Sequence, residues 1–177
     1  EILVPSMTYV ATFQAIKAAG AKPIACDIDE NTCLIDLKDA SSKISKRTKA
    51  IIPVHYTGGV GNLDELYSFA SKHNLRVIED AAHAFGTKYK DNLIGSIGDI
   101  VCFSFDGIKN ITSGEGGCVV TSDSKVAENI KNARLLGVEK DSDNRYKNLR
   151  SWNFDVSNQG WRYHMSNIMA AIGIEQL

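Results

Sequence analysis

A short apolar run that ends in a carboxylate, Leu75–Gly86 (LRVIEDAAHAFG), is the stretch that decides the fold. Its first part has the length and composition of a buried strand, with Asp80 at the carboxyl end. Similar runs recur along the chain, and several are apolar throughout, which is typical of strands covered by helices on both faces. The strand-like runs are Ile2–Pro5, Pro23–Ile28, Ala50–His55, Arg76–Glu79, Ile100–Phe105 and Gly117–Thr121.

Segments of helical periodicity separate these runs. The first, Thr8–Ala19, ends at Gly20, and the second begins with a capping-box pattern at Asn62. A third opens at Asp123 and is expected to end at Gly137. This alternation predicts an α/β fold, with a mostly parallel sheet flanked by helices on both faces. The polar residues 139–160 interrupt the pattern and predict a long surface loop.

Composition places the chain among ordinary globular proteins. Of its 177 residues, 44% are hydrophobic and 23% are charged, and the net charge is −1. A charge so close to zero makes no electrostatic case for binding nucleic acid or an acidic membrane surface. The apolar runs are far shorter than the ~20 residues of a membrane-spanning helix. No charged and then apolar leader opens the chain, so nothing in it suggests secretion.

The four cysteines, at positions 26, 33, 102 and 118, form no C-x-x-C pair. Because no histidine lies at metal-ligand spacing from them, we expect no metal site. Cys102 and Cys118 lie in strand-like runs, where buried free thiols are expected. Free thiols indicate a reducing compartment, and we therefore expect a cytoplasmic protein.

Lys109 lies in Phe103–Asn110 (FSFDGIKN), just before the glycine-rich run Gly114–Gly117 (GEGG). A lysine in a loop is usually a solvated surface charge, but apolar and small residues surround this one. Such surroundings favour the neutral amine that a nucleophile requires. The glycines either let the backbone approach a ligand or simply turn the chain into the next strand.

A carboxylate at one strand end and a lysine after another strand are what a pyridoxal phosphate (PLP) site requires. The lysine attaches the aldehyde of the cofactor, and the carboxylate keeps the pyridine nitrogen protonated. Asp80 stands at the sheet edge where open α/β sheets bind ligands. Taken singly, these residues also have structural interpretations. Asp80 could cap a helix over Ala81–Phe85, His83 could be a half-buried core histidine, and Ser104 could be a strand-end hydroxyl.

Four segments together resemble the DegT/DnrJ/EryC1/StrS family of PLP-dependent sugar aminotransferases. They are Pro5–Thr12, Val77–Gly86, Ser104–Gly117 and Tyr163–Gly173, and the resemblance spans essentially the whole chain. It implies the aspartate aminotransferase fold (fold type I). We expect residues 1–177 to be the central part of the large PLP-binding domain. The family's Ser-Gly-Thr phosphate turn and its small carboxyl-terminal domain would then be absent, and such a segment alone should bind PLP poorly.

The resemblance implies a role for individual residues. Lys109 matches the lysine that forms the Schiff base and later moves the proton. Asp80 matches the partner of the pyridinium nitrogen, and His83 falls where the family places glutamine or histidine against the cofactor ring and its phenolic oxygen. Tyr9 falls on the aromatic residue that stacks on the ring. Ser104 matches the hydroxyl that binds the cofactor phosphate.

The last segment departs from the family pattern. The family usually has Tyr-Asn-Tyr-Arg-Met where this chain has Trp161–Met165 (WRYHM). The family asparagine reaches the cofactor phosphate of the neighbouring subunit, and a guanidinium is a stronger phosphate donor. Arg162 is therefore expected either to bind that phosphate or to remain a surface arginine that meets substrate phosphates or solvent. His55 lies in a family segment near the substrate, but we assign it no role.

The function implied is a transaminase that passes an amino group, from glutamate, to a nucleotide-linked keto-sugar by a ping-pong mechanism. We expect a dTDP-4-keto-6-deoxyhexose aminated at C4, for O-antigen, lipopolysaccharide or a related bacterial surface polysaccharide. The alternatives are a 3-keto-sugar aminotransferase and a non-catalytic binding or sensor protein of the same fold. A third rival, a sugar dehydratase, has histidine in place of the lysine, and Lys109 argues against it.

The family completes each active site with a second chain, so the resemblance also implies a homodimer with shared sites. The loop at 139–160 and the Trp161-Arg162 pair are the expected contributors across the interface. Trp152, Phe154 and Trp161 fit such a contact, because aromatic residues and arginine are enriched at interfaces. The same aromatic residues could instead form a local satellite core.

Overall fold

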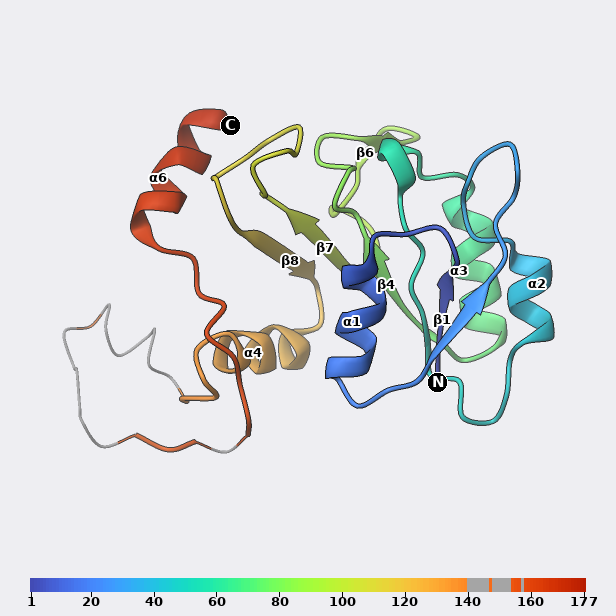
Figure 1. Ribbon diagram of the computed structural model, residues 1–177, viewed down its shortest axis with the longest axis horizontal. Helices are drawn as coiled ribbons and strands as arrows, with labels where there is room; N and C mark the ends of the chain where they lie inside the picture. The colour runs from blue at the N-terminus through green and yellow to red at the C-terminus, as the bar shows by residue number, and fades with distance from the viewer. Residues whose placement is uncertain (140–146, 148–153, 157) are drawn as a thin grey trace.

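The computed structural model describes residues 1–139, 147, 154–156 and 158–177 (Figure 1). Within this part, six strands form one sheet in the order β2-β1-β3-β4-β7-β8. All neighbouring pairs are parallel except β7 and β8, which are antiparallel. The predicted mostly parallel sheet is therefore confirmed. The strands are β1 (Ile2–Pro5), β2 (Pro23–Cys26), β3 (Ala50–Ile51), β4 (Arg76–Asp80), β7 (Ile100–Ser104) and β8 (Gly117–Thr121).

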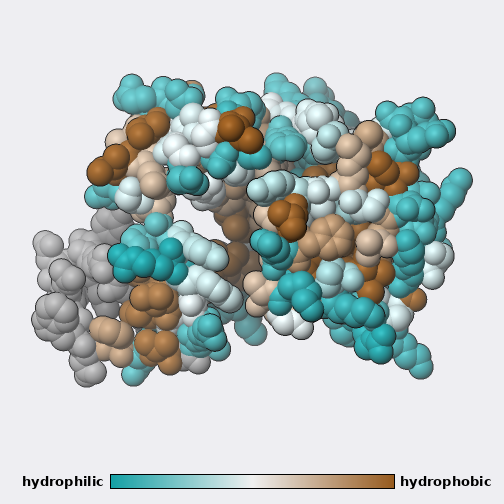
Figure 2. Space-filling model, viewed as in Figure 1, coloured by the Kyte–Doolittle hydropathy of each residue, from teal (hydrophilic) through white to brown (hydrophobic). Residues whose placement is uncertain are grey.

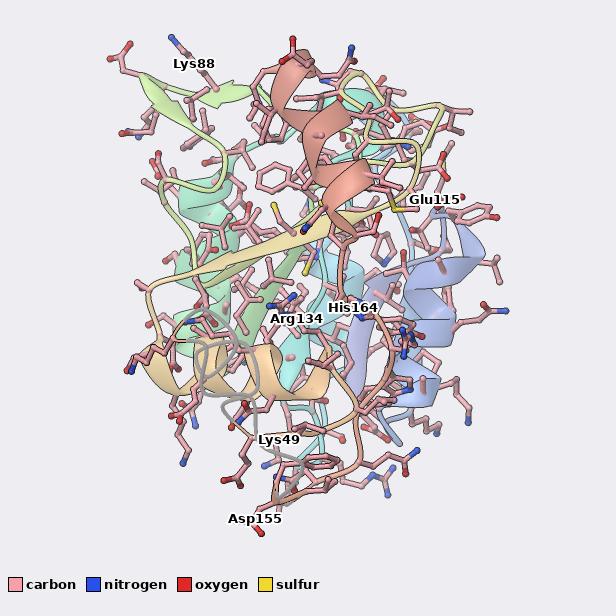
Figure 3. All side chains as sticks on the ribbon, turned by 90° about the vertical axis from the view of Figure 1, so that its left-hand side faces the viewer. Lys49, Lys88, Glu115, Arg134, Asp155 and His164 are labelled. Carbon is pink, nitrogen blue, oxygen red and sulfur yellow. The ribbon has the colours of Figure 1, made fainter. Side chains whose placement is uncertain are left out.

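Helices cover both faces of this sheet, as predicted. Helix α1 (Val10–Ala18) lies on one face, and α2 (Leu37–Ser42) and α3 (Leu63–Lys72) lie on the other, as Figures 1 and 3 show. Successive strand residues point to opposite faces. Val4 therefore packs with Ile16 of α1, whereas Leu3 belongs to the larger core that includes α3.

Side-chain caps begin two of the three predicted helices, α3 and α4 (Ser124–Ala133), whereas α1 has none. Asn62 accepts a hydrogen bond from the backbone N–H of Glu65 at the start of α3, as the capping-box pattern predicts. Asp123 caps α4 by accepting from two backbone N–H groups. The predicted end of this helix at Gly137 is wrong, because α4 ends at Ala133. The chain bends there, and the N–H of Leu136 donates to the carbonyl of Trp161 instead.

Several elements were not predicted from the sequence. They are the six-residue helix α2, a 3₁₀ turn η1 (Tyr56–Gly58), and a two-stranded hairpin formed by β5 (Lys88–Tyr89) and β6 (Asn92–Leu93). The predicted surface loop at 139–160 lies largely outside the described residues, as does Trp152.

Helix α6 (Asn167–Gln176) follows the sheet and is capped by Ser166. It is apolar on all sides, yet none of its side chains is buried. Ile168 is 77% exposed and Ile174 is 67% exposed, and Figure 2 shows hydrophobic residues on the surface over this helix. Among the described residues, no helix is both long and apolar enough to cross a membrane.

Candidate active site

The carboxyl ends of β1, β4 and β7 meet at one edge of the sheet, because these strands run in the same direction. Five of the six residues predicted for the site follow those strand ends. Tyr9 follows β1, Asp80 ends β4, and His83 comes three residues later. Ser104 ends β7, and Lys109 lies in the loop behind it. The fold therefore places these five residues at the ligand-binding edge of an open sheet.

Asp80 is held by hydrogen bonds to both its backbone and its side chain. Its N–H donates to Pro53, and its carbonyl accepts from the N–H of His55. In the side chain, Oδ2 accepts from the hydroxyl of Thr12 at 2.8 Å, and Oδ1 accepts from the N–H of Ala82 at 3.2 Å. Residues 81–86 form turns rather than a helix, so the interpretation of Asp80 as a helix cap is wrong.

His83 lies beside the 3₁₀ turn η1. The backbone N–H of Thr57 donates to His83 Nδ1 at 3.4 Å, and the ring of Tyr56 meets the imidazole edge-on at 6.2 Å. Since Nδ1 is the acceptor, the proton of the neutral ring lies on Nε2. His83 is exposed, so the expectation of a half-buried core histidine is wrong.

A tight turn carries Lys109. The carbonyl of Asp106 accepts from the N–H of Lys109 at 3.0 Å, and Asp106 Oδ1 accepts from the N–H of Ile108 at 3.1 Å. Asp106 in turn donates its own N–H to Ser104 Oγ at 3.3 Å. Lys109 is half-buried, whereas Ile108 beside it is exposed. These contacts fix the backbone from which the lysine side chain extends.

The loop of Lys109 also contacts the loop of His83. The side-chain amide of Asn110 donates to the carbonyl oxygen of Phe85 at 2.8 Å. The ring of Phe85 packs edge-to-face on Phe103 and Phe105, with centroids 5.4 and 5.7 Å apart. Phe103 lies in β7, and Phe105 directly follows this strand. The loop that carries the amine is therefore packed against the loop that follows the carboxylate of Asp80.

Arg162 does not follow one of these strand ends, because it comes after β8 and α4 in the chain. It pairs with Leu135, just beyond α4, and its side chain is exposed. The neighbouring Tyr163 donates its N–H to Arg134, and Met165 reaches the glycine loop near Gly116. The predicted contact of Arg162 is with a cofactor phosphate in a neighbouring subunit, and it stays a prediction.

The model of one protein family, the DegT/DnrJ/EryC1/StrS aminotransferase family, matches residues 1–177. The chain belongs to this family. As a DegT/DnrJ/EryC1/StrS member, it is 45% identical to the uncharacterized protein MJ1066 of Methanocaldococcus jannaschii and 41% identical to the spore coat polysaccharide biosynthesis protein SpsC of Bacillus subtilis. Each match covers 100% of the chain and 46% of the relative, so the chain spans about half the length of these relatives.

Solved structures of sugar aminotransferases have the same fold as this DegT/DnrJ/EryC1/StrS chain. Helicobacter pylori PseC, an aminotransferase involved in pseudoaminic acid biosynthesis, matches with a TM-score of 0.88 and 30% identity, over 99% of the chain and 45% of PseC. The PMP-form of the putative sugar aminotransferase Spr1654 of Streptococcus pneumoniae matches with a TM-score of 0.86 and 31% identity, over 99% of the chain and 49% of Spr1654. The predicted family and fold class are both confirmed.

A buried polar cluster in this family member had no predicted role. His55 Nε2 lies 2.7 Å from Glu79 Oε2, and both side chains are only 1% exposed. The hydroxyl of Tyr67 donates to the other carboxylate oxygen of Glu79 and accepts from the N–H of Asp99. A carboxylate within an apolar strand, directly before Asp80, was the sequence signal that could have predicted this cluster.

All four cysteines of this family member are free, as predicted. The predicted burial of Cys102 and Cys118 is wrong, because both are only half-buried on the last two strands of the sheet, whereas Cys26 is buried. Burial, together with the nearby charge of Asp80, raises the pKa of the Cys102 thiol to about 11. Among the described residues, no group of histidine, cysteine, aspartate and glutamate side chains is arranged to hold a metal ion.

Proposed function

We propose that this chain is the central part of the PLP-binding domain of an aminotransferase that acts on a nucleotide-linked keto-sugar, with glutamate as the amino donor. The observation that carries the proposal is that Lys109 and Asp80 lie at the same edge of the sheet, where the loop of Lys109 packs against the loop that follows Asp80. Family membership and the likeness to solved sugar aminotransferases support it.

The residues at this edge fit PLP by their chemistry. The ionised Asp80 can accept a hydrogen bond from a protonated ring nitrogen, and His83 can donate from Nε2 because Nδ1 is already an acceptor. Ser104 Oγ accepts from Asp106, so its hydroxyl proton can donate to a phosphate oxygen. Tyr9 is 78% exposed at the start of α1 and offers a ring face for stacking.

When bound, PLP supplies an aldehyde for covalent attachment and a ring that accepts electrons. Lys109 would provide the amine at Nζ, and the same atom would hold and move the proton between the two carbons that exchange it. Asp80 would hold the ring nitrogen in its protonated state. The turn around Asp106 fixes the backbone of Lys109, so the amine reaches the site from one direction.

For the substrate, the compartment and the oligomeric state, the proposal keeps the expectations from the sequence. We place the substrate among dTDP-linked 4-keto-6-deoxyhexoses, aminated at C4 for a bacterial surface polysaccharide such as O-antigen or lipopolysaccharide. SpsC, at 41% identity, is named for spore coat polysaccharide biosynthesis, which favours a surface sugar. The four free cysteines support a cytoplasmic enzyme. The exposed Phe154 and Trp161 support a homodimer with shared sites.

The test uses the protein expressed with any sequence that flanks this chain in its gene. Incubation with PLP should produce a visible absorbance band that borohydride abolishes. Reduction should leave the cofactor covalently attached to the peptide that contains Lys109, as located by mass spectrometry. Lys109→Ala should lose both signals, whereas the matched control Lys88→Ala, on the exposed β5 hairpin, should keep them. Amino transfer from glutamate is then assayed on a panel of dTDP-, UDP- and GDP-linked keto-sugars. Absence of the band in the wild-type protein would refute the proposal and leave the binding or sensor alternative.

A further inference from the structure

Thr12 is a polar residue on the packed face of α1. It is only 7% exposed, although its neighbour on the same face, Ile16, belongs to an apolar cluster with Val4 and Ile52. A threonine inside a helix commonly returns its hydroxyl to a backbone carbonyl one turn earlier. The hydroxyl of Thr12 instead crosses to β4 and meets Asp80 Oδ2 at 2.8 Å, 68 positions along the chain.

The chemistry of the carboxylate fixes the direction of this hydrogen bond. An ionised carboxylate can only accept, so Thr12 must donate its one hydroxyl proton to Asp80. Thr8 Oγ1 lies 2.7 Å from Thr12 Oγ1. Because the proton of Thr12 is already used, Thr8 must be the donor in that pair. The result is a one-way chain of hydroxyls that runs from Thr8 through Thr12 to Asp80.

The chain of hydroxyls limits how Asp80 can turn. Oδ2 is held by Thr12, and Oδ1 is held by the N–H of Ala82 at 3.2 Å. With one donor on each oxygen, rotation of the carboxylate about its Cβ–Cγ bond would break both bonds. Bonds to a charged acceptor are about twice as strong as those between neutral groups. The remaining lone pairs of the carboxylate therefore keep a constant direction.

We propose that Thr8 and Thr12 are positioning residues that hold the Asp80 carboxylate toward the cofactor ring nitrogen. This rests on the proposed function, because it concerns the same site. Tyr9 lies between the two threonines, and its carbonyl accepts from the N–H of Thr12 at 3.1 Å. This backbone bond holds Tyr9 beside Thr12 at the start of α1. Thr12 thus contacts two residues with predicted cofactor contacts, Asp80 through its hydroxyl and Tyr9 through its backbone.

The test compares Thr12→Val, Thr12→Ser and Thr8→Val with a matched control, Thr48→Val. Thr48 is also buried, at 6% exposed, and uses its hydroxyl to accept from Ser45, but it precedes β3 at the opposite edge of the sheet. Each variant is prepared in the protein expressed with its flanking sequence. Three quantities are measured: the dissociation constant for PLP, the ¹⁵N chemical shift of the ring nitrogen of labelled PLP, and the melting temperature without cofactor.

Thr12→Val should weaken PLP binding about tenfold or more, because it removes a hydrogen bond to a charged group. It should also move the ring-nitrogen shift away from the wild-type value. Thr12→Ser should restore both, and Thr8→Val should change both in the same direction but less. Thr48→Val should lose stability without moving the shift. If Thr12→Val does not fold, Thr12→Ala and Thr8→Val provide the comparison.

The outcomes separate the two proposals. A wild-type protein that binds no PLP refutes the proposed function. A wild-type protein that binds PLP, with an unchanged affinity and ring-nitrogen shift in the Thr12 and Thr8 variants, overturns the positioning role alone. A shift that moves equally in Thr48→Val also overturns it, because the effect would then come from general loss of packing. In an Asp80→Asn background, Thr12→Val should no longer change the affinity for PLP or the ring-nitrogen shift. That result would support the role, since Thr12 acts through the carboxylate of Asp80.

Discussion

The side-chain amide of Asn110 donates a hydrogen bond to the carbonyl oxygen of Phe85 across 2.8 Å, and this bond joins the loop of Lys109 to the loop of His83. The ring of Phe85 is held separately, between the rings of Phe103 and Phe105. Phe85 is thus fixed by both its backbone and its side chain. Because Asn110 is hydrogen-bonded to Phe85, the backbone of the neighbouring Lys109 is also held in place.

Asn110→Ala is expected to lower kcat more than it lowers stability. Loss of one hydrogen bond should cost about 0.5–1 kcal/mol in the free energy of unfolding. The displaced lysine should reduce kcat by roughly tenfold or more, because small errors of placement are costly at a reacting group. Urea unfolding and steady-state kinetics measure the two effects. In the exposed control, Asn31→Ala, both should stay near wild type; equal kcat values for Asn110→Ala and wild type would contradict the prediction.

His55→Leu is expected to destabilise the fold by about 3 kcal/mol, because it removes one of the two side chains that hydrogen-bond the buried carboxylate of Glu79, the other being Tyr67. Chemical denaturation at neutral pH measures the loss. His73→Leu serves as the control: His73 follows α3 and is half-buried against Phe69, so its replacement should cost about 1 kcal/mol or less. Similar losses in the two variants would show that the His55–Glu79 pair adds little.

Tyr67 should make stability fall at high pH. Burial, and then the hydrogen bond to Glu79, raise the pKa of the folded Tyr67 far above its usual range. In the unfolded chain the same group ionises near pH 10, at about its ordinary pKa. Above that pH the unfolded state holds fewer protons than the folded state, so the contribution of Tyr67 to stability is complete below about pH 10 and declines as the pH rises.

Comparison of Tyr67→Phe with the wild-type protein isolates this contribution. The free energy of unfolding is measured between pH 7 and pH 11 for both proteins. The difference between them should be constant up to about pH 9 and should then shrink by at most about 1.4 kcal/mol per pH unit. A difference that grows with pH would have the wrong sign and would rule out the buried neutral hydroxyl.

Cys102 should resist alkylation. With its pKa raised to about 11, roughly one thiol in a thousand is ionised at pH 8. Cys26 is buried and its pKa is also raised, whereas Cys33 is partly exposed in a loop. Brief treatment of the native protein with iodoacetamide at pH 8, read by peptide mass spectrometry, should therefore modify Cys33 first and Cys102 late. Early modification of Cys102 would mean that the thiol is less buried than the structure places it.

The order of strands and helices could be predicted from the sequence, and the candidate site residues could be singled out from it, although their roles stay predictions. Strand runs such as Arg76–Asp80 carry their own apolar composition, and the caps at Asn62 and Asp123 act within three residues of themselves. Lys109, Asp80 and Ser104 could be singled out because their neighbours in the sequence carry the family pattern. Such signals are local, so they need no knowledge of the fold.

The contacts that place those residues could not be predicted. Thr12 reaches Asp80 across 68 positions, His55 reaches Glu79 across 24, and Asn110 reaches Phe85 across 25. Helix α2 was missed because six residues give too little periodicity, and the end of α4 was misplaced because a distant segment holds the bend that follows it. Sequence determined which chemical groups the chain carries and the local elements that bear them. Only the tertiary structure decided which hydroxyl, amide or imidazole faces each of them, because those pairs form only when the parallel sheet brings separate strand ends to one edge.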